Sequence, residues 1–275
     1  MSAFPVPQEY QEQFKGSMSD NKGVKLPFPA PTLWWMNGNA AFKNTKEIED
    51  ARRFGGFGIS KEDIEEQGIP AAQTWKLHDL TNTKGDQYAA YLCRTAWVAP
   101  IARRFAWFEN EGKWRSSLNI LAYLAIMDAN KKFTPYGAVI LSAKSFTGNA
   151  LDKCFKDFAT KTAELRGDTL TNFFFHPIGT WGNEVKLEEI KGKGGASSTI
   201  TPPQLYIPKD GYTAEHLQQW FVPNALPEVL ADMRDYKANA QEWLDDWKNR
   251  KNDKQNGNGH DVNAELAAAE DDLPF

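Results

Sequence analysis

Four consecutive runs of aromatic and branched residues constrain the fold of this chain more than any other feature. They extend from Tyr88 to Val98, Ile101 to Glu109, Ser117 to Met127 and Tyr136 to Ala143. Such residues are enriched in β-strands, and the runs are separated by the turn formers Pro100, Glu111-Gly112, Asn130-Lys131-Lys132 and Pro135. Short connections between successive strands favour antiparallel pairing. We therefore predict an antiparallel meander, either open or closed into a barrel.

Further elements flank this meander and give an α+β fold with peripheral helices. Prolines at 5, 7, 27, 29 and 31 predict an irregular N-terminal arm, and Leu33 to Met36 is predicted as the first strand. Additional strands are predicted at 173–181, 184–190 and 199–207. Helices are predicted at 46–54, from Ser60 to near Gly68, at 147–162, from Thr213, and from Pro227 onwards.

The last of these helices carries apolar residues at helical spacing. The stripe consists of Leu226, Leu230, Met233, Tyr236, Ala240, Trp243, Leu244 and Trp247. We interpret it as a core-packing face, with self-association into a homo-oligomer as the alternative. The whole chain divides into an irregular arm (1–31), a β-rich core (32–210), a helical segment packed on it (211–250), a flexible linker (251–269) and an acidic tip (270–275).

Composition and motifs argue against several classes of protein. No run approaches the roughly eighteen apolar residues of a membrane span, and the first ten residues lack the pattern of a secretory signal. Cys93 and Cys154 are too few for a disulfide framework, so we expect two buried thiols in a cytoplasmic protein. The four histidines lack metal-ligand spacing, and no phosphate loop or nucleophile motif occurs. We therefore expect no enzyme activity, no metal and no cofactor.

Charge is distributed unevenly along the chain. Between Lys84 and Lys161 there are 12 Lys or Arg against 6 Asp or Glu, whereas residues 251–275 carry 2 Lys against 6 acids. A basic middle with acidic flanks is the pattern expected of a surface that binds a polyanion.

Aromatic residues are interleaved with the cations of this basic segment. Single-stranded nucleic acids are bound by cations along the phosphates and by flat rings that stack on the bases. In a strand, Arg103, Phe105 and Trp107 would share one face while Arg104 points to the other. The candidate DNA-binding residues are Arg94, Trp97, Arg103, Arg104, Trp107, Trp114, Arg115, Lys131 and Lys132. The alternative is that these rings fill the core and the cations form a solvated rim.

The end of the chain carries a short acidic motif. Residues 251–259 are nearly all Lys, Asn, Asp, Gln and Gly, a composition that predicts a mobile tether. Glu270 and then Asp271, Asp272, Leu273, Pro274 and Phe275 follow. Such a tip offers an aromatic ring and a carboxylate to a pocket lined with Arg or Lys.

This tip resembles the C-terminal interaction peptide of bacterial and phage single-stranded DNA-binding proteins. Asp271 and Asp272 match the family's acids, Pro274 and Phe275 match directly, and Leu273 stands where isoleucine is more usual. The resemblance covers only the tail. It implies an OB-like body that binds single-stranded DNA and a tip that recruits host replication and repair proteins. The alternatives are an adaptor that uses the tip without binding DNA, and a DNA-processing enzyme component such as an annealing protein or nuclease.

Overall fold

The computed structural model of the 275-residue chain describes residues 25–38, 55–66, 75–81, 86–110, 113–167, 173–180, 188–191 and 197–246. The predicted helix at 46–54, the linker, the tip and most of the N-terminal arm lie outside these residues.

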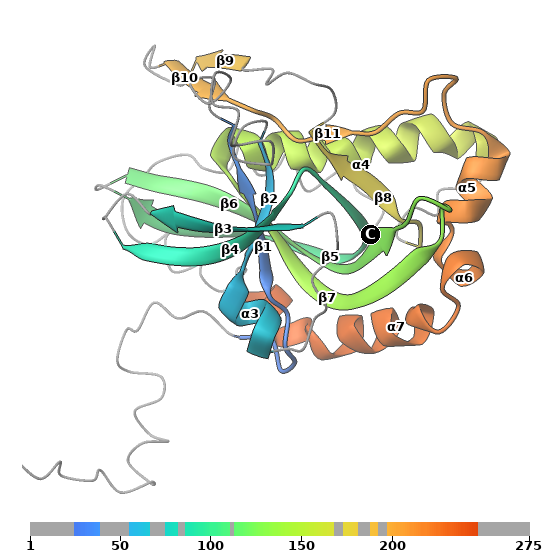
Figure 1. The fold of residues 1–275 in the computed structure, drawn as a ribbon, viewed down its shortest axis with the longest axis horizontal. Helices are drawn as coiled ribbons and strands as arrows, with labels where there is room; N and C mark the ends of the chain where they lie inside the picture. Colours follow the sequence, from blue (N-terminus) through green and yellow to red (C-terminus); the bar gives the residue numbers. More distant parts are fainter. Residues whose placement is uncertain are drawn as a thin grey trace, which may run out of the picture.

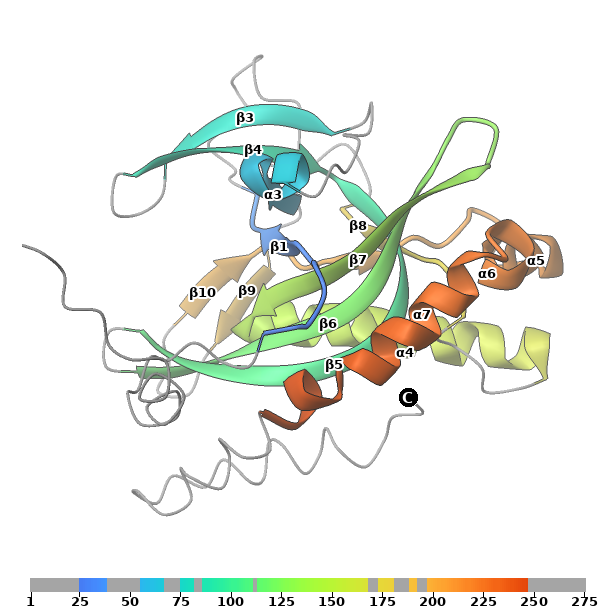
Figure 2. The same ribbon diagram turned by 90° about the horizontal axis from the view of Figure 1, so that it is seen from below.

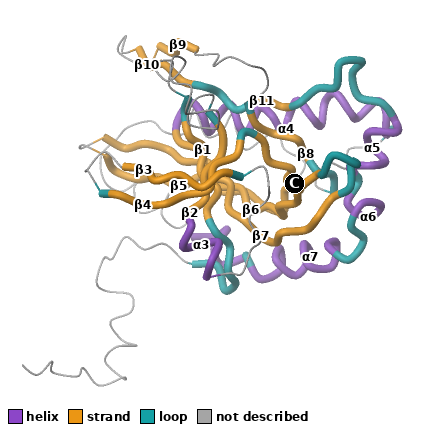
Figure 3. Tube along the Cα trace, viewed as in Figure 1, coloured by secondary structure: helices purple, strands orange, loops and turns teal. Residues whose placement is uncertain are grey.

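A nine-stranded sheet forms the body of the protein, in the order β11-β8-β5-β6-β7-β1-β2-β4-β3 (Figures 1 and 3). Its strands are β1 (Thr32–Met36), β2 (Gly56–Ser60), β3 (Lys76–Thr81), β4 (Gln87–Cys93), β5 (Thr95–Asn110), β6 (Lys113–Met127), β7 (Phe133–Lys144), β8 (His176–Gly179) and β11 (Gln204–Leu205). Two further strands, β9 (Glu188–Lys191) and β10 (Ser197–Ile200), pair separately.

The long hairpins of the predicted meander are confirmed, but the sheet is mixed rather than antiparallel. β5, β6 and β7 pair antiparallel in sequence order. The N-terminal strand β1 then adds to β7 in parallel, with Thr32 opposite Ile140 and Trp34 opposite Ser142. Sequence reasoning missed this pair because the two strands are far apart in the chain, and only tertiary folding brings them together.

The predicted strand break at Pro100 is wrong. Pro100 lies inside β5, opposite Ala122, and the register with β6 shifts between Pro100 and Ala102. A bulge is one of the places where a sheet tolerates a residue with no N–H to donate. Pro135, also predicted as a turn residue, lies inside β7 beside a second register shift at Ala125. The strand predicted from Tyr88 to Val98 is instead interrupted at Arg94, which lies between β4 and β5.

The sheet curls into a half-barrel (Figure 2). Its inner face holds an apolar core. The helix α4 (Ser145–Arg166) packs against this core through Leu151, Cys154 and Phe155. Close approach of α4 to the sheet depends on Gly148, where an added Cβ would lie 2.9 Å from the Ala143 carbonyl oxygen. The helix predicted at 147–162 is therefore confirmed, although it begins two residues earlier, at Ser145, and extends to Arg166. Among the strand residues buried in the same core are Leu33, Phe57, Leu118 and Leu141.

A second core covers the outer face of β5, β6 and β7. The helices α5 (Ala214–Trp220), α6 (Val222–Ala225) and α7 (Val229–Asn239) lie along this side of the molecule (Figures 1 and 2). Met233, Ala240 and Trp243 of the predicted stripe are buried against it, which confirms core packing for them, whereas Trp247 lies outside the described residues.

Two helices, α3 (Lys61–Glu66) and α5, begin at the capping residues that the sequence indicates, whereas α4 and α7 begin without a side-chain cap. Ser60 Oγ accepts a hydrogen bond from the Asp63 N–H, 3.0 Å away, at the start of α3. Thr213 caps α5 in a reciprocal arrangement with His216. Each cap satisfies N–H groups that the first helical turn leaves without partners.

Both cysteines are buried and form no disulfide, as predicted. Burial raises the pKa of the Cys154 thiol to about 12 and also raises the pKa of Cys93. Neither sulfur is therefore suited to nucleophilic chemistry near neutral pH. Among the described helices, none has the length and apolar character needed to cross a membrane.

Candidate nucleic-acid interface

Four of the sequence-predicted residues lie towards one end of the long hairpins. Arg94 immediately precedes β5 and Trp97 lies near the beginning of that strand, while Lys131 and Lys132 lie in the turn between β6 and β7. The Asp128 carboxylate organises this turn by accepting hydrogen bonds from the N–H groups of residues 130 and 132, at 2.8 and 2.9 Å. Both lysines are exposed there and available to an anionic ligand.

Trp97 itself packs into the outer core. Its ring contacts Phe133 and Trp220 edge to face, with centroid separations of 5.3 and 5.2 Å. These contacts favour a structural role for most of the indole, although the side chain keeps part of its surface exposed.

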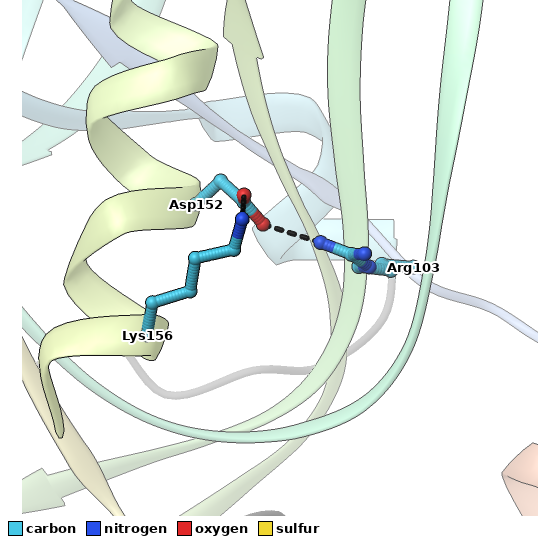
Figure 4. A network of polar contacts seen from close by, with 3 residues as sticks. All are labelled: Arg103, Asp152 and Lys156. Carbon is cyan, nitrogen blue, oxygen red and sulfur yellow. Dashed lines mark hydrogen bonds and ion pairs between the residues drawn. The ribbon is translucent and has the colours of Figure 1, made fainter. Parts of the chain in front are cut away.

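Arg103 points toward α4. Its guanidinium donates to the Asp152 carboxylate, which also lies 3.4 Å from the Lys156 ammonium (Figure 4). The two side chains of the Arg103–Asp152 pair are 15% and 14% exposed. Burial lowers the pKa of Arg103 and Asp152 opposes that shift, so the arginine stays charged and holds β5 to the helix.

Arg104 lies on the opposite face of β5, as the alternation predicts. It donates to the Trp243 carbonyl at 2.8 Å, and its guanidinium carbon lies 4.0 Å from the centroid of the Trp243 ring. Asp246 supplies a carboxylate at 3.4 Å. Arg104 thus stacks against the segment that follows α7.

Trp107, Trp114 and Arg115 belong to the other end of the β5–β6 hairpin. The backbone register places them opposite residues 116, 109 and 108 respectively. Their side chains lie outside the part of the chain that the structure describes. At about 3.3 Å per residue, Trp107 lies roughly 30 Å along β5 from Trp97. The predicted residues are therefore spread along the hairpins and over both faces of the sheet.

Sequence reasoning missed a row of residues that crosses the outer face. Backbone pairing aligns one residue from each of seven strands. Within this row, Asn119, Ser142 and Trp34 are partly exposed, and Lys76 is exposed. In order across the sheet, the row is Arg104, Asn119, Ser142, Trp34, Gly58, Leu92 and Lys76.

Trp34 and Tyr88 form an aromatic pair on this face. Their ring centroids are 6.4 Å apart with an interplanar angle of 56°, and Tyr88 is 39% exposed. The neighbouring Trp35 points inward, where its Nε1 donates to the Thr201 carbonyl at 2.8 Å. The alternation of two successive tryptophans in a strand was a usable signal, since one of them had to face outward.

The structure brings no metal-binding cluster together among the residues that it describes. His176 is buried between the rings of Phe155 and Phe158, and His216 belongs to the α5 cap. The tip residues Asp271, Asp272, Leu273, Pro274 and Phe275 lie outside the described ranges.

Comparisons with protein-family models, with curated protein sequences and with solved structures return no match for this chain.

Proposed function

We propose that this protein binds single-stranded DNA on an OB-like barrel and recruits replication, recombination or repair proteins of its host through the C-terminal tip. It would act in the cytoplasm without a cofactor and without catalysis. The proposal unites the basic, aromatic middle of the chain with the acidic Asp271–Phe275 motif.

The observation that carries the proposal is that one long stretch of chain, made of β4 and β5, pairs with both ends of a curled run of strands. β4 and β5 follow each other with only Arg94 between them. β4 pairs with β2, β5 pairs with β6, and β6, β7, β1 and β2 complete the circuit. If β4 and β5 are counted as one long strand, then this strand and β6, β7, β1 and β2 make five. These five would correspond to the partly open five-stranded barrel of the OB fold, a frequent scaffold for oligonucleotide binding.

The chemistry required of such a protein is simple. Lys131, Lys132 and other cations would neutralise phosphates, and exposed rings would stack on bases. Trp107 and Trp114 keep their place among the candidate stacking residues. When a strand occupies the DNA site, the acidic tip would be displaced from its cations and would present Phe275 to a partner protein.

A titration with single- and double-stranded oligonucleotides tests the proposal. We expect preferential binding of oligo-dT, with a slope of log K against log salt concentration of about −0.7 per phosphate neutralised. Equal affinity for duplex DNA, or binding that is indifferent to salt, would contradict it.

The alternative adaptor function gains some support from the ion pairs of Arg103 and Arg104, because both guanidiniums already face carboxylates of the chain. In that case the same titration shows no oligonucleotide binding, while recruitment through the tip persists.

A further inference from the structure

We propose that Trp34 and Tyr88 form a platform on which a single strand stacks its bases, with Lys76 and Lys144 as phosphate contacts beside it. This inference rests on the proposed function and adds to it a site that the sequence did not indicate. It is carried by three features of the outer face.

The first feature is the close packing of the Trp34 indole ring on Gly58, where a larger side chain would collide with it. Trp34 lies opposite Gly58 of β2, and a Cβ on that glycine would lie only 2.8 Å from Cε2 and 2.9 Å from Cζ2 of the indole. The ring therefore lies directly against the backbone of β2, toward β4 and Tyr88. Any larger residue at position 58 would lift or turn it.

The second feature is that both rings of the pair are anchored and yet remain partly exposed. Trp34 packs against a small buried cluster contributed by β3 and β4, while Tyr88 remains 39% exposed at its side. An anchored and partly exposed pair of rings is suited to stacking because little conformational freedom is lost on binding. The members of the buried cluster are Leu80, Ala90 and Leu92.

The third feature is charge. The row of residues that contains Trp34 includes the exposed Lys76 at one end, while Arg104 at the other end is already paired with Asp246. In the adjacent row on the same face, the exposed Lys144 lies opposite Ser117. Because neighbouring strands are about 4.8 Å apart, Lys76 lies about 14 Å from Trp34, three strands away. Lys76 of β3 and Lys144 of β7 therefore lie on opposite sides of the rings.

These features together select the ligand. A neutral sugar would use the rings but would gain nothing from the cations. An acidic peptide would use the cations, but it does not carry a flat ring for each of its charges. A single-stranded nucleic acid has both a repeating phosphate and a repeating flat base, so it matches both features at once.

The test compares two ligands of equal charge: oligo-dT and an abasic oligonucleotide of the same length. We expect the unmodified protein to bind oligo-dT more tightly than the abasic strand. Tyr88→Ala and Gly58→Ala should weaken oligo-dT binding by about 5- to 150-fold, the range for one lost stack. Both variants should bind the abasic strand as the unmodified protein does.

Tyr88→Phe keeps the ring and should retain the preference for oligo-dT over the abasic strand. Lys76→Gln removes a phosphate contact and should weaken binding of both ligands.

Leu77→Ala provides the matched control. Leu77 is 46% exposed and adjoins Lys76 in β3, but strand alternation turns it to the opposite face. We expect no change in affinity for either ligand. Because Tyr88 is exposed, its variant stays folded even if Gly58→Ala does not.

The outcomes distinguish failure of the proposed function from failure of the stacking platform. If the unmodified protein binds neither strand, the proposed function fails and the platform with it. In the second outcome, the unmodified protein binds oligo-dT tightly while the folded Tyr88→Ala and Gly58→Ala variants bind oligo-dT with the same affinity. That result overturns the platform and leaves the proposed function standing. A loss of thermal stability without a change in affinity would likewise assign the two rings to packing alone.

Discussion

His176 shows how strongly burial changes the protonation of a single side chain in this protein. It is fully buried, its Nδ1 lies 2.9 Å from the Phe174 carbonyl oxygen, and the ring centroid lies 3.9 Å from that of Phe158. Burial among these rings lowers its pKa from 6.5 to about 3, although the Phe174 carbonyl favours the charged form. The folded protein therefore holds a neutral imidazole throughout the mildly acidic range.

This burial predicts acid sensitivity. Below pH 6.5 the unfolded chain takes up a proton on His176 that the folded chain does not take up until about pH 3. Stability should therefore fall as pH falls through this window, by about 2 kcal/mol between pH 7 and pH 5 from this residue. Urea unfolding at a series of pH values measures the effect. His176→Gln should flatten the dependence, so equal curves for this variant and the unmodified protein would contradict the assignment.

At the scale of elements, a polar contact joins α4 to the sheet. Asp152 lies on the inner side of the helix and meets Arg103 of β5, with Lys156 one turn further on (Figure 4). Asp157 of the same helix pairs with Lys153 on the outside, 2.6 Å away, where the two side chains are 37% and 70% exposed. One helix thus carries a largely buried and a solvated version of the same interaction.

The two aspartates should respond differently to the same substitution. Asp152→Asn leaves a largely buried guanidinium without its carboxylate, so we expect the free energy of unfolding to drop by about 3 kcal/mol. Asp157→Asn removes an exposed pair and should cost less than about 1 kcal/mol. Chemical unfolding of both variants measures the difference. Equal losses would show that the Arg103 contact does not hold the helix to the sheet.

Elements and residues differ in how far the sequence predicts them. Ser60 and Thr213 act through near neighbours, so their capping roles follow from local chemistry. Pro100 was misjudged because a bulge, which depends on the partner strand, can absorb a proline. The carboxylate partners of Arg103 and Arg104 come from residues 49 and 142 positions away, beyond the reach of any local pattern.

The same limit applies to the whole molecule. The sequence indicated a basic, aromatic β-rich body, and the structure confirms the curled sheet. The sequence did not indicate that β1 would pair with β7 and place Trp34 on the outer face. Nor did it indicate that the segment after α7 would cover part of that face near Arg104. Both facts depend on contacts between distant segments, and the first adds Trp34 of β1 to the stacking candidates that the sequence indicated on β5 and β6.

The C-terminal tip, Asp271 to Phe275, concerns how the whole protein would engage its partners. If Asp271 to Phe275 is a recruiting peptide, the ring and the terminal carboxylate of Phe275 must enter a partner's pocket together. Removing this one residue should therefore abolish recruitment. It should leave DNA affinity unchanged, because an acidic tip has no favourable contact to offer phosphates.

Removing residues 270–275 entirely should tighten DNA binding at low salt. An anionic tip tethered to the body competes for the same cations at high effective concentration, and added salt should screen that competition. The experiment compares the full chain, the form ending at Pro274 and the form ending at Ala269, each tested for oligo-dT affinity and for pull-down of host replication proteins. A form ending at Pro274 that loses DNA binding but keeps its partners would place the tip within the DNA site or the fold, because only a direct contact of Phe275 with the body or the strand could produce that result.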